Sequence, residues 1–215
     1  MKWTAYIVGA YLLGSAPFGL WIAHLHGVDL RKVGSGNIGA TNVIRALGRN
    51  WGIFCFVLDV LKGFMPMILV PLLELGGSEP SAGHLLGWLA VGTAAILGHI
   101  FPIYLRFKGG KGVATSLGVV LGLWPYFTVC GLAAFIIWLI TVRIWRYVSL
   151  ASILAAGAFP ILLLIAILFL EDWTFDSLWP LFLVAVPMPL LVIFRHRANI
   201  QRLIAGTENK IGPKK

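Results

Sequence analysis

The 215-residue chain is 59% hydrophobic and only 12% charged, with a mean hydropathy of +0.91. Soluble domains carry about 25% charged residues, so this composition excludes an ordinary soluble enzyme, a disordered chain and a nucleic-acid-binding protein that relies on charge. It predicts an all-α integral membrane protein with a single domain, 1–215. Lysine and arginine number 17 against 8 acidic residues, an excess that marks cytoplasmic loops in membrane proteins. Cys55 and Cys130 lie in apolar runs and predict neither a disulfide framework nor a metal site.

Seven apolar runs divide the chain, and six of them have 17–25 residues. That length suits a hydrocarbon core of about 30 Å at about 1.5 Å rise per residue. The run 112–123 has only 12 residues. It is either a sheltered half-span or the start of one helix, 112–142, kinked at Pro125. The predicted segments are 3–24, 51–75, 84–103, 112–123, 125–142, 148–170 and 178–194.

The distribution of basic residues decides between these alternatives. If the chain reverses at Pro125 and the N-terminus lies outside, 15 of the 17 basic residues face the cytoplasm. Lys2 is then outside and Lys62 lies within a segment. One helix over 112–142 would instead leave 7 basic residues inside and 9 outside. The positive-inside rule therefore favours seven transmembrane segments, one of them short, with a cytoplasmic C-terminus.

The first inner loop, 29–45, has the composition of an anion site. Gly34, Gly36 and Gly39 allow close backbone approach, and Arg45 follows as a fork-shaped cation. Backbone N–H groups can then turn toward one anion, helped by the helix that begins after them. The loop indicates phosphate or oxyanion binding, with a flexible turn between helices as an equal alternative. Its small hydrogen-bonding side chains are Ser35, Asn37, Thr41 and Asn42.

A second glycine-rich segment, 106–116, places Lys111 among Gly109, Gly110 and Gly112 before a predicted helix. It is not a nucleotide-binding P-loop, because Gly112 stands where that motif requires Ser or Thr. It predicts a second anion cradle with one lysine inside it. Two cradles on one membrane face imply one ligand with two phosphates, or two ligands with one each.

Further polar groups fall on the same face. Ser149 begins the sixth segment, and His196 and Asn199 share a helix face after the seventh. A histidine beside arginines is more often a solvated cap than a catalyst, so both roles stay open for His196. Glu208, in a basic tail, predicts a structural ion pair.

Two charged residues, Asp59 and Lys62, lie inside the second segment at i and i+3. Ionisable groups within a membrane suggest a functional site, but this spacing also allows a structural ion pair. His99, at the inner end of the third segment, is expected to be a satisfied helix-end histidine. The pattern H-x-x-x-x-D at His24–Asp29 is typical of acyl-CoA-dependent acyltransferases. It lacks a companion motif, and we treat it as a chance match.

Over nearly its whole length, the chain resembles the acyl-phosphate-dependent glycerol-3-phosphate acyltransferases of bacterial membranes, the PlsY family. The stretch Gly34-Ser-Gly-Asn-Ile-Gly-Ala-Thr-Asn-Val-Ile-Arg45 is similar to their first motif, and Lys108-Gly-Gly-Lys-Gly-Val-Ala-Thr115 to their second. The third motif is matched by Ser149, His196-Arg-Ala-Asn-Ile200 and Gly206-Thr-Glu208. The step Asp59-Val-Leu-Lys-Gly63 is also similar to that family.

This resemblance implies an acyltransferase of the bacterial inner membrane with its active site facing the cytoplasm. The reaction would move a fatty acyl group from long-chain acyl phosphate to the sn-1 hydroxyl of glycerol 3-phosphate. Its products would be lysophosphatidic acid and phosphate, in the first step of phospholipid synthesis. We expect no cofactor, no metal, and neither a nucleotide nor a nucleic acid as partner. Because acyl phosphate has a good leaving group, no covalent nucleophile is needed, and the substrate's own phosphate is our hypothesis for the base.

The resemblance also assigns residues to roles. Arg45, Lys111, His196 and Asn199 would bind glycerol 3-phosphate with Ser149 close by. The pocket for the phosphoryl group of acyl phosphate would be lined by Ser35, Asn37, Gly39, Ala40, Thr41 and Asn42. The residues expected to be catalytic are Ser35, Arg45, Lys111, Ser149, His196 and Asn199. The residues expected to bind substrate are Gly34, Gly36, Asn37, Gly39, Ala40, Thr41, Asn42, Lys108, Gly109, Gly110 and Gly112.

Two other functions compete with this interpretation. A transporter of an anionic solute would place its site at mid-membrane on broken helices, often with internal repeats. Here the cations lie at one surface, and the two halves show no symmetry. An alcohol phosphotransferase would need an acidic cluster for divalent metals. Only Asp29 and Glu208 are expected on the cytoplasmic side.

Overall fold

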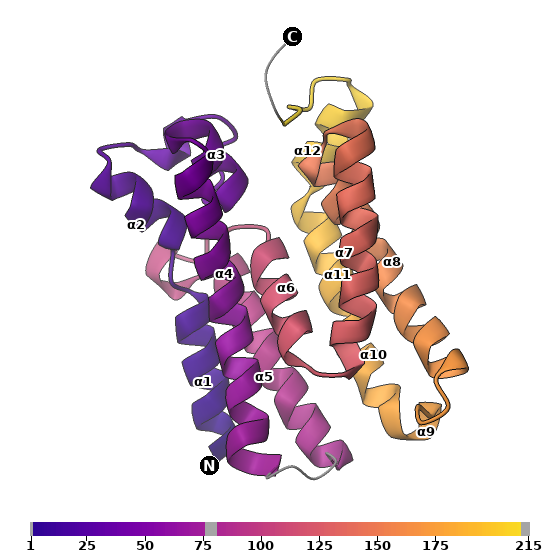
Figure 1. The fold of residues 1–215 in the computed structure, drawn as a ribbon. Helices are drawn as coiled ribbons and strands as arrows, with labels where there is room; N and C mark the ends of the chain where they lie inside the picture. Colours follow the sequence, from indigo (N-terminus) through magenta and orange to yellow (C-terminus); the bar gives the residue numbers. More distant parts are fainter. Residues whose placement is uncertain (1, 76–80, 212–215) are drawn as a thin grey trace. The chain divides into compact units, whose positions relative to one another are not determined.

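The computed structural model describes residues 2–75 and 81–211, and the regular structure in both ranges is helical (Figure 1). Lys214 and Lys215, counted above as cytoplasmic, lie outside the described residues. The helices form two compact units, Met1–Leu123 and Trp124–Lys215. The single domain over 1–215 stays a prediction.

Six stretches are long and apolar enough to cross a membrane, and a shorter apolar helix adds to them. This confirms an all-α membrane protein with one short segment. A continuous helix over 112–142 is wrong, because one helix ends at Gly122 and the next begins at Tyr126, with Pro125 between them. The six stretches are Lys2–Leu25, Arg49–Leu73, Ala82–Leu105, Tyr126–Trp145, Val148–Phe169 and Phe175–Arg195; the shorter helix is Val113–Gly122.

Unit 1 is built on close contacts between α4 and α6 and between α1 and α5. Glycines at the crossings let the backbones touch: a Cβ on Gly63 would overlap the carbonyl of Thr115, and one on Gly14 the carbonyl of Ala95. Small residues are the usual means of such packing between membrane helices. The helices are α1 (Lys2–Gly14), α2 (Phe18–Leu25), α3 (Ala40–Leu47), α4 (Arg49–Val70), α5 (Ala82–Ile100) and α6 (Val113–Gly122), with 3₁₀ turns at Leu30–Lys32 and Ile103–Leu105 and a π-helical turn at Pro71–Leu75.

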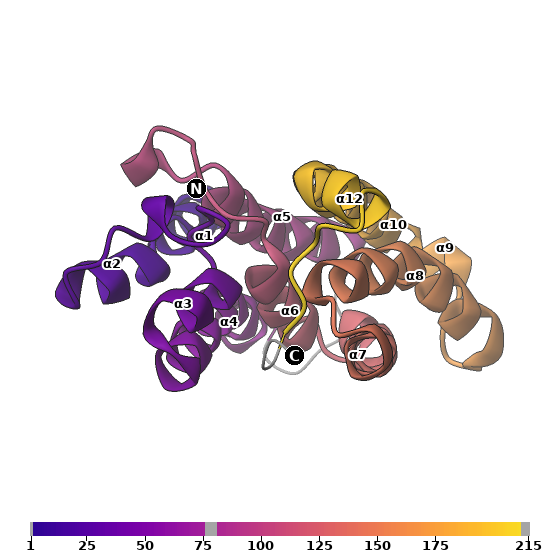
Figure 2. The ribbon, with the colours of Figure 1, turned by 90° about the horizontal axis from the view of Figure 1, so that it is seen from above.

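The first predicted segment, 3–24, is not one helix. α1 ends at Gly14, and α2 begins at Phe18 and runs sideways when unit 1 is viewed along α1 (Figure 2). The reason is Pro17, which has no N–H to donate to the preceding turn. The Ala16 amide instead bonds the Leu13 carbonyl at 3.0 Å, which tightens the turn.

Unit 2 begins with a helical hairpin, α7 (Tyr126–Trp145) and α8 (Val148–Phe169), against which α11 (Pro187–Arg195) and α12 (Arg197–Ile204) pack. The predicted helix 178–194 is interrupted. It is divided into α9 (Phe175–Leu178), a 3₁₀ turn at Trp179–Leu181, α10 (Phe182–Ala185) and α11. Prolines within this stretch remove backbone donors and account for the breaks. They are Pro180, Pro187 and Pro189.

Replacing Gly14 with alanine should destabilise unit 1, because the new methyl group overlaps the Ala95 backbone, which cannot move as a side chain could. Overpacking of this kind costs about 1–3 kcal/mol. The matched control lies in the same helix: a Cβ on Gly9 meets nothing within 4 Å. Thermal unfolding in detergent should show a lower Tm for Gly14→Ala and no loss for Gly9→Ala. Equal Tm values would contradict the close α1–α5 packing.

Candidate functional site

The first glycine-rich loop is organised from inside by the side chain of Asn42, which is 1% exposed. Its Oδ1 accepts from the Ser35 amide at 3.0 Å, and its Nδ2 donates to the carbonyls of Leu30 and Val33 at 3.0 Å each. Gly34 fits because its φ is +58° and a Cβ there would overlap Asn42 Oδ1. The geometry therefore gives Asn42 a positioning role, and its direct contact with substrate stays a prediction.

Hydrogen-bond donors remain open where this loop enters α3. The Gly39 amide donates to Asn37 Oδ1 at 2.9 Å, and the Asn42 amide to the Gly39 carbonyl. Within the described chain, the amides of Ala40 and Thr41 have no partner, as expected for the first turn of a helix. The positive end of the α3 dipole adds to their attraction for an anion.

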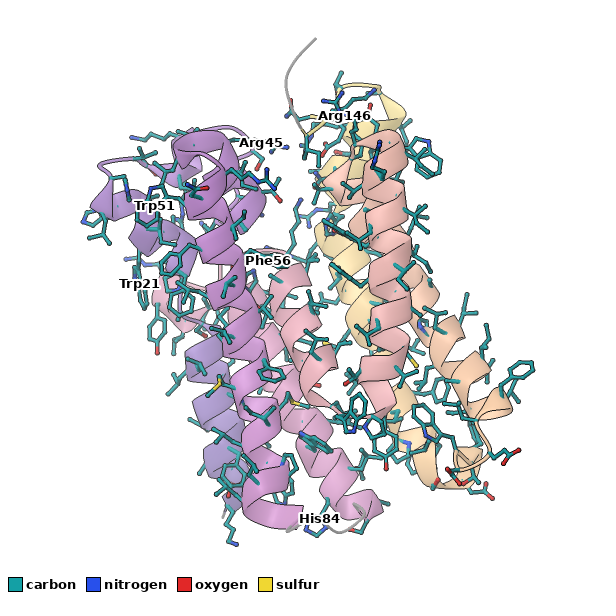
Figure 3. All side chains as sticks on the ribbon, viewed as in Figure 1. Trp21, Arg45, Trp51, Phe56, His84 and Arg146 are labelled. Carbon is teal, nitrogen blue, oxygen red and sulfur yellow. The ribbon has the colours of Figure 1, made fainter. Side chains whose placement is uncertain are left out.

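Arg45, one turn further along α3, belongs to the same place. Its aliphatic Cδ lies beside Gly34, close enough to be 3.4 Å from a Cβ built there. The side chain is exposed near the end of unit 1 that carries α3 (Figure 3). The predicted combination of loop, helix start and arginine is therefore present in unit 1.

The second loop differs from the expected cradle of amides. The amides of Gly109 and Gly110 donate to the carbonyls of Ile100 and His99, at 3.2 and 3.1 Å, and so fasten the loop to the end of α5. A Cβ on Gly110 would overlap the His99 ring, and one on Gly109 the His99 carbonyl. These glycines are needed for close packing on α5, and their N–H groups are not turned toward a ligand.

Open hydrogen-bonding groups in the second loop gather instead at the start of α6, directly after Lys111. Gly112 precedes the helix with a φ of +87°, a conformation that favours glycine. The hydroxyls of Thr115 and Ser116 are buried and have no hydrogen-bond partner in the part of the chain that the structure describes. The first turn of α6 and Lys111 are thus the part of this loop suited to an anion.

A buried set of charged side chains lies between the helices of unit 1. Asp59 and Lys62, each 3% exposed, form an ion pair with 2.7 Å between Oδ1 and Nζ. His99 Nδ1 lies 3.7 Å from the same carboxylate oxygen. The ion pair expected from the i, i+3 spacing is confirmed.

In unit 2, the carboxylate of Glu208 accepts hydrogen bonds from three side chains on two helices, α8 and α12. Oε1 accepts from Ser149 Oγ at 2.9 Å and from Asn199 Nδ2 at 2.7 Å, while Oε2 accepts from Arg202 Nε at 2.7 Å. The predicted ion pair of Glu208 is thereby confirmed, with Arg202 as its partner. Sequence reasoning missed that this carboxylate also holds Ser149 and Asn199 together.

Burial acts to raise the pKa of the Glu208 carboxyl, whose side chain is 5% exposed. Hydrogen bonds from Asn199, Arg202 and Ser149, with the charge of Arg202, outweigh it and bring the pKa below its usual 4.5. Glu208 is therefore an anion that orients its neighbours, and a weak base.

His196 is not a solvated cap, because it is only 2% exposed. Its Nδ1 lies 2.8 Å from the Val192 carbonyl, which can only accept. The proton of a neutral ring is therefore assigned to Nδ1, and Nε2 is the atom that can accept one. His196 and Asn199 are brought together at the start of α12, as their spacing predicted.

The C-terminal tail reaches back to the turn between α7 and α8. Arg146, labelled in Figure 3, donates from Nε to the Ile211 carbonyl at 2.9 Å, and the Ile211 amide donates to the Arg146 carbonyl at 2.9 Å. Lys210 Nζ lies 5.3 Å from the centre of the Tyr147 ring. These contacts hold the segment that carries Glu208 against α8. Sequence reasoning missed Arg146, because nothing in the motif marks it.

Comparison with known proteins gives a consistent result over nearly the whole chain. The family model for glycerol-3-phosphate acyltransferase matches residues 4–206. Proteins named glycerol-3-phosphate acyltransferase are 48% identical in Geotalea daltonii, over 94% of both chains, and 45% identical in Aquifex aeolicus, over 98% of this chain and 100% of the relative.

Solved structures agree with the sequence relatives. The crystal structure of PlsY, an integral membrane glycerol 3-phosphate acyltransferase, in its glycerol 3-phosphate form has a TM-score of 0.83 and 42% identity, covering 99% of this chain and 96% of that one. The lysophosphatidic acid form has a TM-score of 0.81 and 40% identity, with the same coverage.

Acid should weaken unit 2 through Glu208. The pKa of Glu208 is lower in the folded protein than in the unfolded chain. Its ionised carboxylate therefore stabilises the fold fully at a pH above the ordinary glutamate pKa, and this stabilisation is lost as the pH falls through the pKa of the folded protein. Glu208→Gln should lower Tm at pH 7 by about 2–6 °C. Between pH 7 and pH 3, the Tm of this variant should fall less steeply than the Tm of the parent. Glu171→Gln, a change at an exposed acid, is the control. Parallel Tm–pH curves for the parent and Glu208→Gln would contradict this account.

Proposed function

The chain belongs to the glycerol-3-phosphate acyltransferase family, and on that premise we propose that it transfers a fatty acyl group from acyl phosphate to the sn-1 hydroxyl of glycerol 3-phosphate. The products are lysophosphatidic acid and phosphate, and the step begins phospholipid synthesis. The observation that carries the proposal is the match over residues 4–206, which contains the first two polar motifs and the third as far as Gly206. The comparisons give no support to a transporter of an anionic solute.

Two phosphate-bearing substrates repel one another, so the enzyme must supply cations and hydrogen-bond donors for both. Unit 1 contributes the starts of α3 and α6, each with a cation nearby, Arg45 and Lys111. We assign residues 35–42 to the phosphoryl group of acyl phosphate. Arg45 and Lys111 are assigned to glycerol 3-phosphate. Within unit 2, His196 and Asn199 are assigned to glycerol 3-phosphate as the family resemblance implies, and Glu208 accepts a hydrogen bond from Ser149.

The reaction needs no covalent enzyme intermediate. The sn-1 oxygen attacks the carbonyl carbon of acyl phosphate, a new C–O bond forms, and the bond from that carbon to the phosphate oxygen breaks with its electron pair leaving on phosphate. Donors at the start of α3 stabilise the developing oxyanion. Holding the hydroxyl against the carbonyl can supply about 7–11 kcal/mol of the barrier.

The hydroxyl proton is proposed to pass to substrate phosphate. The carboxylates near the loops are poor alternatives. Glu208 has a lowered pKa and three donors, and Asp29 accepts from the Arg31 amide and pairs with Lys32 at 3.5 Å. Among the described residues, no group of three His, Cys, Asp or Glu side chains is placed to hold a metal, and the reaction as written requires none.

We further propose seven transmembrane segments in the bacterial inner membrane, with the N-terminus outside and both glycine-rich loops in the cytoplasm. The basic residues support this arrangement, since 15 of 17 then lie inside. Within unit 1, the end that carries α3 lies opposite the N-terminus, in agreement with it (Figure 1).

The proposed reaction is tested by supplying purified protein with palmitoyl phosphate and glycerol 3-phosphate in the presence of chelator. Phosphate release should require both substrates and persist without divalent metal. Lys111→Ala should lower kcat/KM for glycerol 3-phosphate by about 10²-fold, because a charged hydrogen bond is lost. The control Lys2→Ala lies at the opposite end of unit 1. Release with palmitoyl-CoA but not palmitoyl phosphate would refute the proposal and restore the His24–Asp29 pattern as a candidate site.

His196→Ala tests the identity of the base. If His196 binds substrate, the variant should raise KM for glycerol 3-phosphate about tenfold or more and keep most of the turnover at saturation. The partly buried His84, in the first turn of α5, supplies the control, His84→Ala. A collapse in kcat with an unchanged KM would show that His196, and not substrate phosphate, takes the proton.

A further inference from the structure

The Asp59 cluster, which we define as Asp59, Lys62 and His99, has no part in the reaction as written. All three side chains are at most 5% exposed within the helices of unit 1. Burying an ion pair gains little stability, and well-packed apolar residues in its place are often as stable or more so. Charges inside a membrane therefore call for a role beyond stability.

One arm of the cluster leads to the first glycine-rich loop. Lys62 Nζ donates to the Ala16 carbonyl at 2.8 Å and lies 5.5 Å from the centre of the Phe18 ring. Ala16 stands in the break before α2, where the helical bond to its carbonyl is lost because the Leu20 amide bonds Pro17 instead. Lys62 thus fixes the starting point of α2.

α2 in turn supports the first loop directly. A Cβ on Gly19 would overlap the carbonyl of Ile38, which lies between Asn37 and Gly39 in the loop. The same helix shares a buried apolar cluster with the loop and its neighbours, formed by Ile22, Ala23, Leu30, Val43 and Cys55. A shift of α2 would therefore move residues 35–42, because Gly19 packs directly against the Ile38 carbonyl.

The other arm leads to the second loop. His99 Nδ1 faces Asp59 Oδ1 at 3.7 Å, and the opposite side of the ring, at Nε2, packs against Gly110. The His99 carbonyl also accepts the Gly110 amide at 3.1 Å. Lys111 follows Gly110 directly, so the position of the His99 ring fixes the backbone position from which the Lys111 side chain extends.

From these contacts we infer that the Asp59 cluster is a positioning device that fixes the two phosphate-binding loops relative to each other, through Lys62 on one side and His99 on the other. Asp59 is the shared group, because the same Oδ1 faces both partners. The inference rests on the proposed function, in which the first loop takes acyl phosphate and Lys111 takes glycerol 3-phosphate. The three residues position the loops and touch neither substrate.

Three substitutions distinguish the connection through Lys62 to the first loop from the connection through His99 to the second loop. Lys62→Met should raise KM mainly for acyl phosphate, and His99→Leu mainly for glycerol 3-phosphate, each by about tenfold. Asp59→Asn should raise both. Glycerol 3-phosphate affinity measured by calorimetry gives a second readout that does not depend on turnover. Thr141→Val is the matched control, because Thr141 is also buried in a membrane helix but, among the described residues, its hydroxyl bonds the Ile137 carbonyl of its own helix.

A purely structural role would lower Tm and the yield of active enzyme while both KM values stayed at the parent's, and that result would overturn the inference. If Asp59→Asn does not fold, the double variant Asp59→Asn with Lys62→Met carries the test, since it leaves no buried charge unpaired. It should fold and still show both KM values raised. Parent protein that turns over no acyl phosphate would refute the proposed function instead, and calorimetry on the variants would still decide the positioning role.

Discussion

A backbone that leaves helical geometry must find other hydrogen-bond partners, and within the membrane the protein must supply them because the hydrocarbon offers none. The break at Pro17 is met by Lys62, which donates to the Ala16 carbonyl. The first loop is held by the Asn42 amide group, and the second by carbonyls at the end of α5. In unit 2, side-chain hydrogen bonds to Glu208 tie the C-terminal segment to α8 and α12, and the Ile211 amide donates to the Arg146 carbonyl. Every irregular segment of the site is therefore tied to a buried polar group.

This constraint also determines which groups are left for substrates. The amides of Ser35, Gly109 and Gly110 are engaged in holding the loops, and the open donors among the described residues include those in the first turns of α3 and α6. Each turn has a cation close in sequence, Arg45 for α3 and Lys111 for α6, and both turns are suited to phosphate. An enzyme that transfers an acyl group from acyl phosphate to glycerol 3-phosphate must bind two phosphates close together. It does not need a covalent nucleophile, because phosphate is already a good leaving group.

Much of this organisation could be predicted from the sequence. Apolar length and the placement of basic residues indicated the segments, and the glycine pattern indicated both loops. Breaks at Pro17 and within 178–194 were missed, because hydropathy averages over a proline and a second, tilted helix is equally apolar. The amides of Gly109 and Gly110 were assigned to an anion because sequence does not show that α5 offers its carbonyls first. The sequence predicted one ion pair for Glu208, because Ser149 is distant in the chain and only the fold brings it beside this carboxylate.

Amide hydrogen exchange of the substrate-free protein tests the central claim most directly, namely that buried side chains and helix ends hold the irregular loops in place before any substrate binds. The account predicts that peptides covering 33–42 and 107–112 exchange on the order of 10²-fold more slowly than free peptide, although they lie largely outside helices. Within the peptide 33–42, the Ser35 amide should exchange more slowly than the Thr41 amide, which has no hydrogen-bond partner among the described residues. Exchange at the rate of free peptide throughout both loops would contradict it.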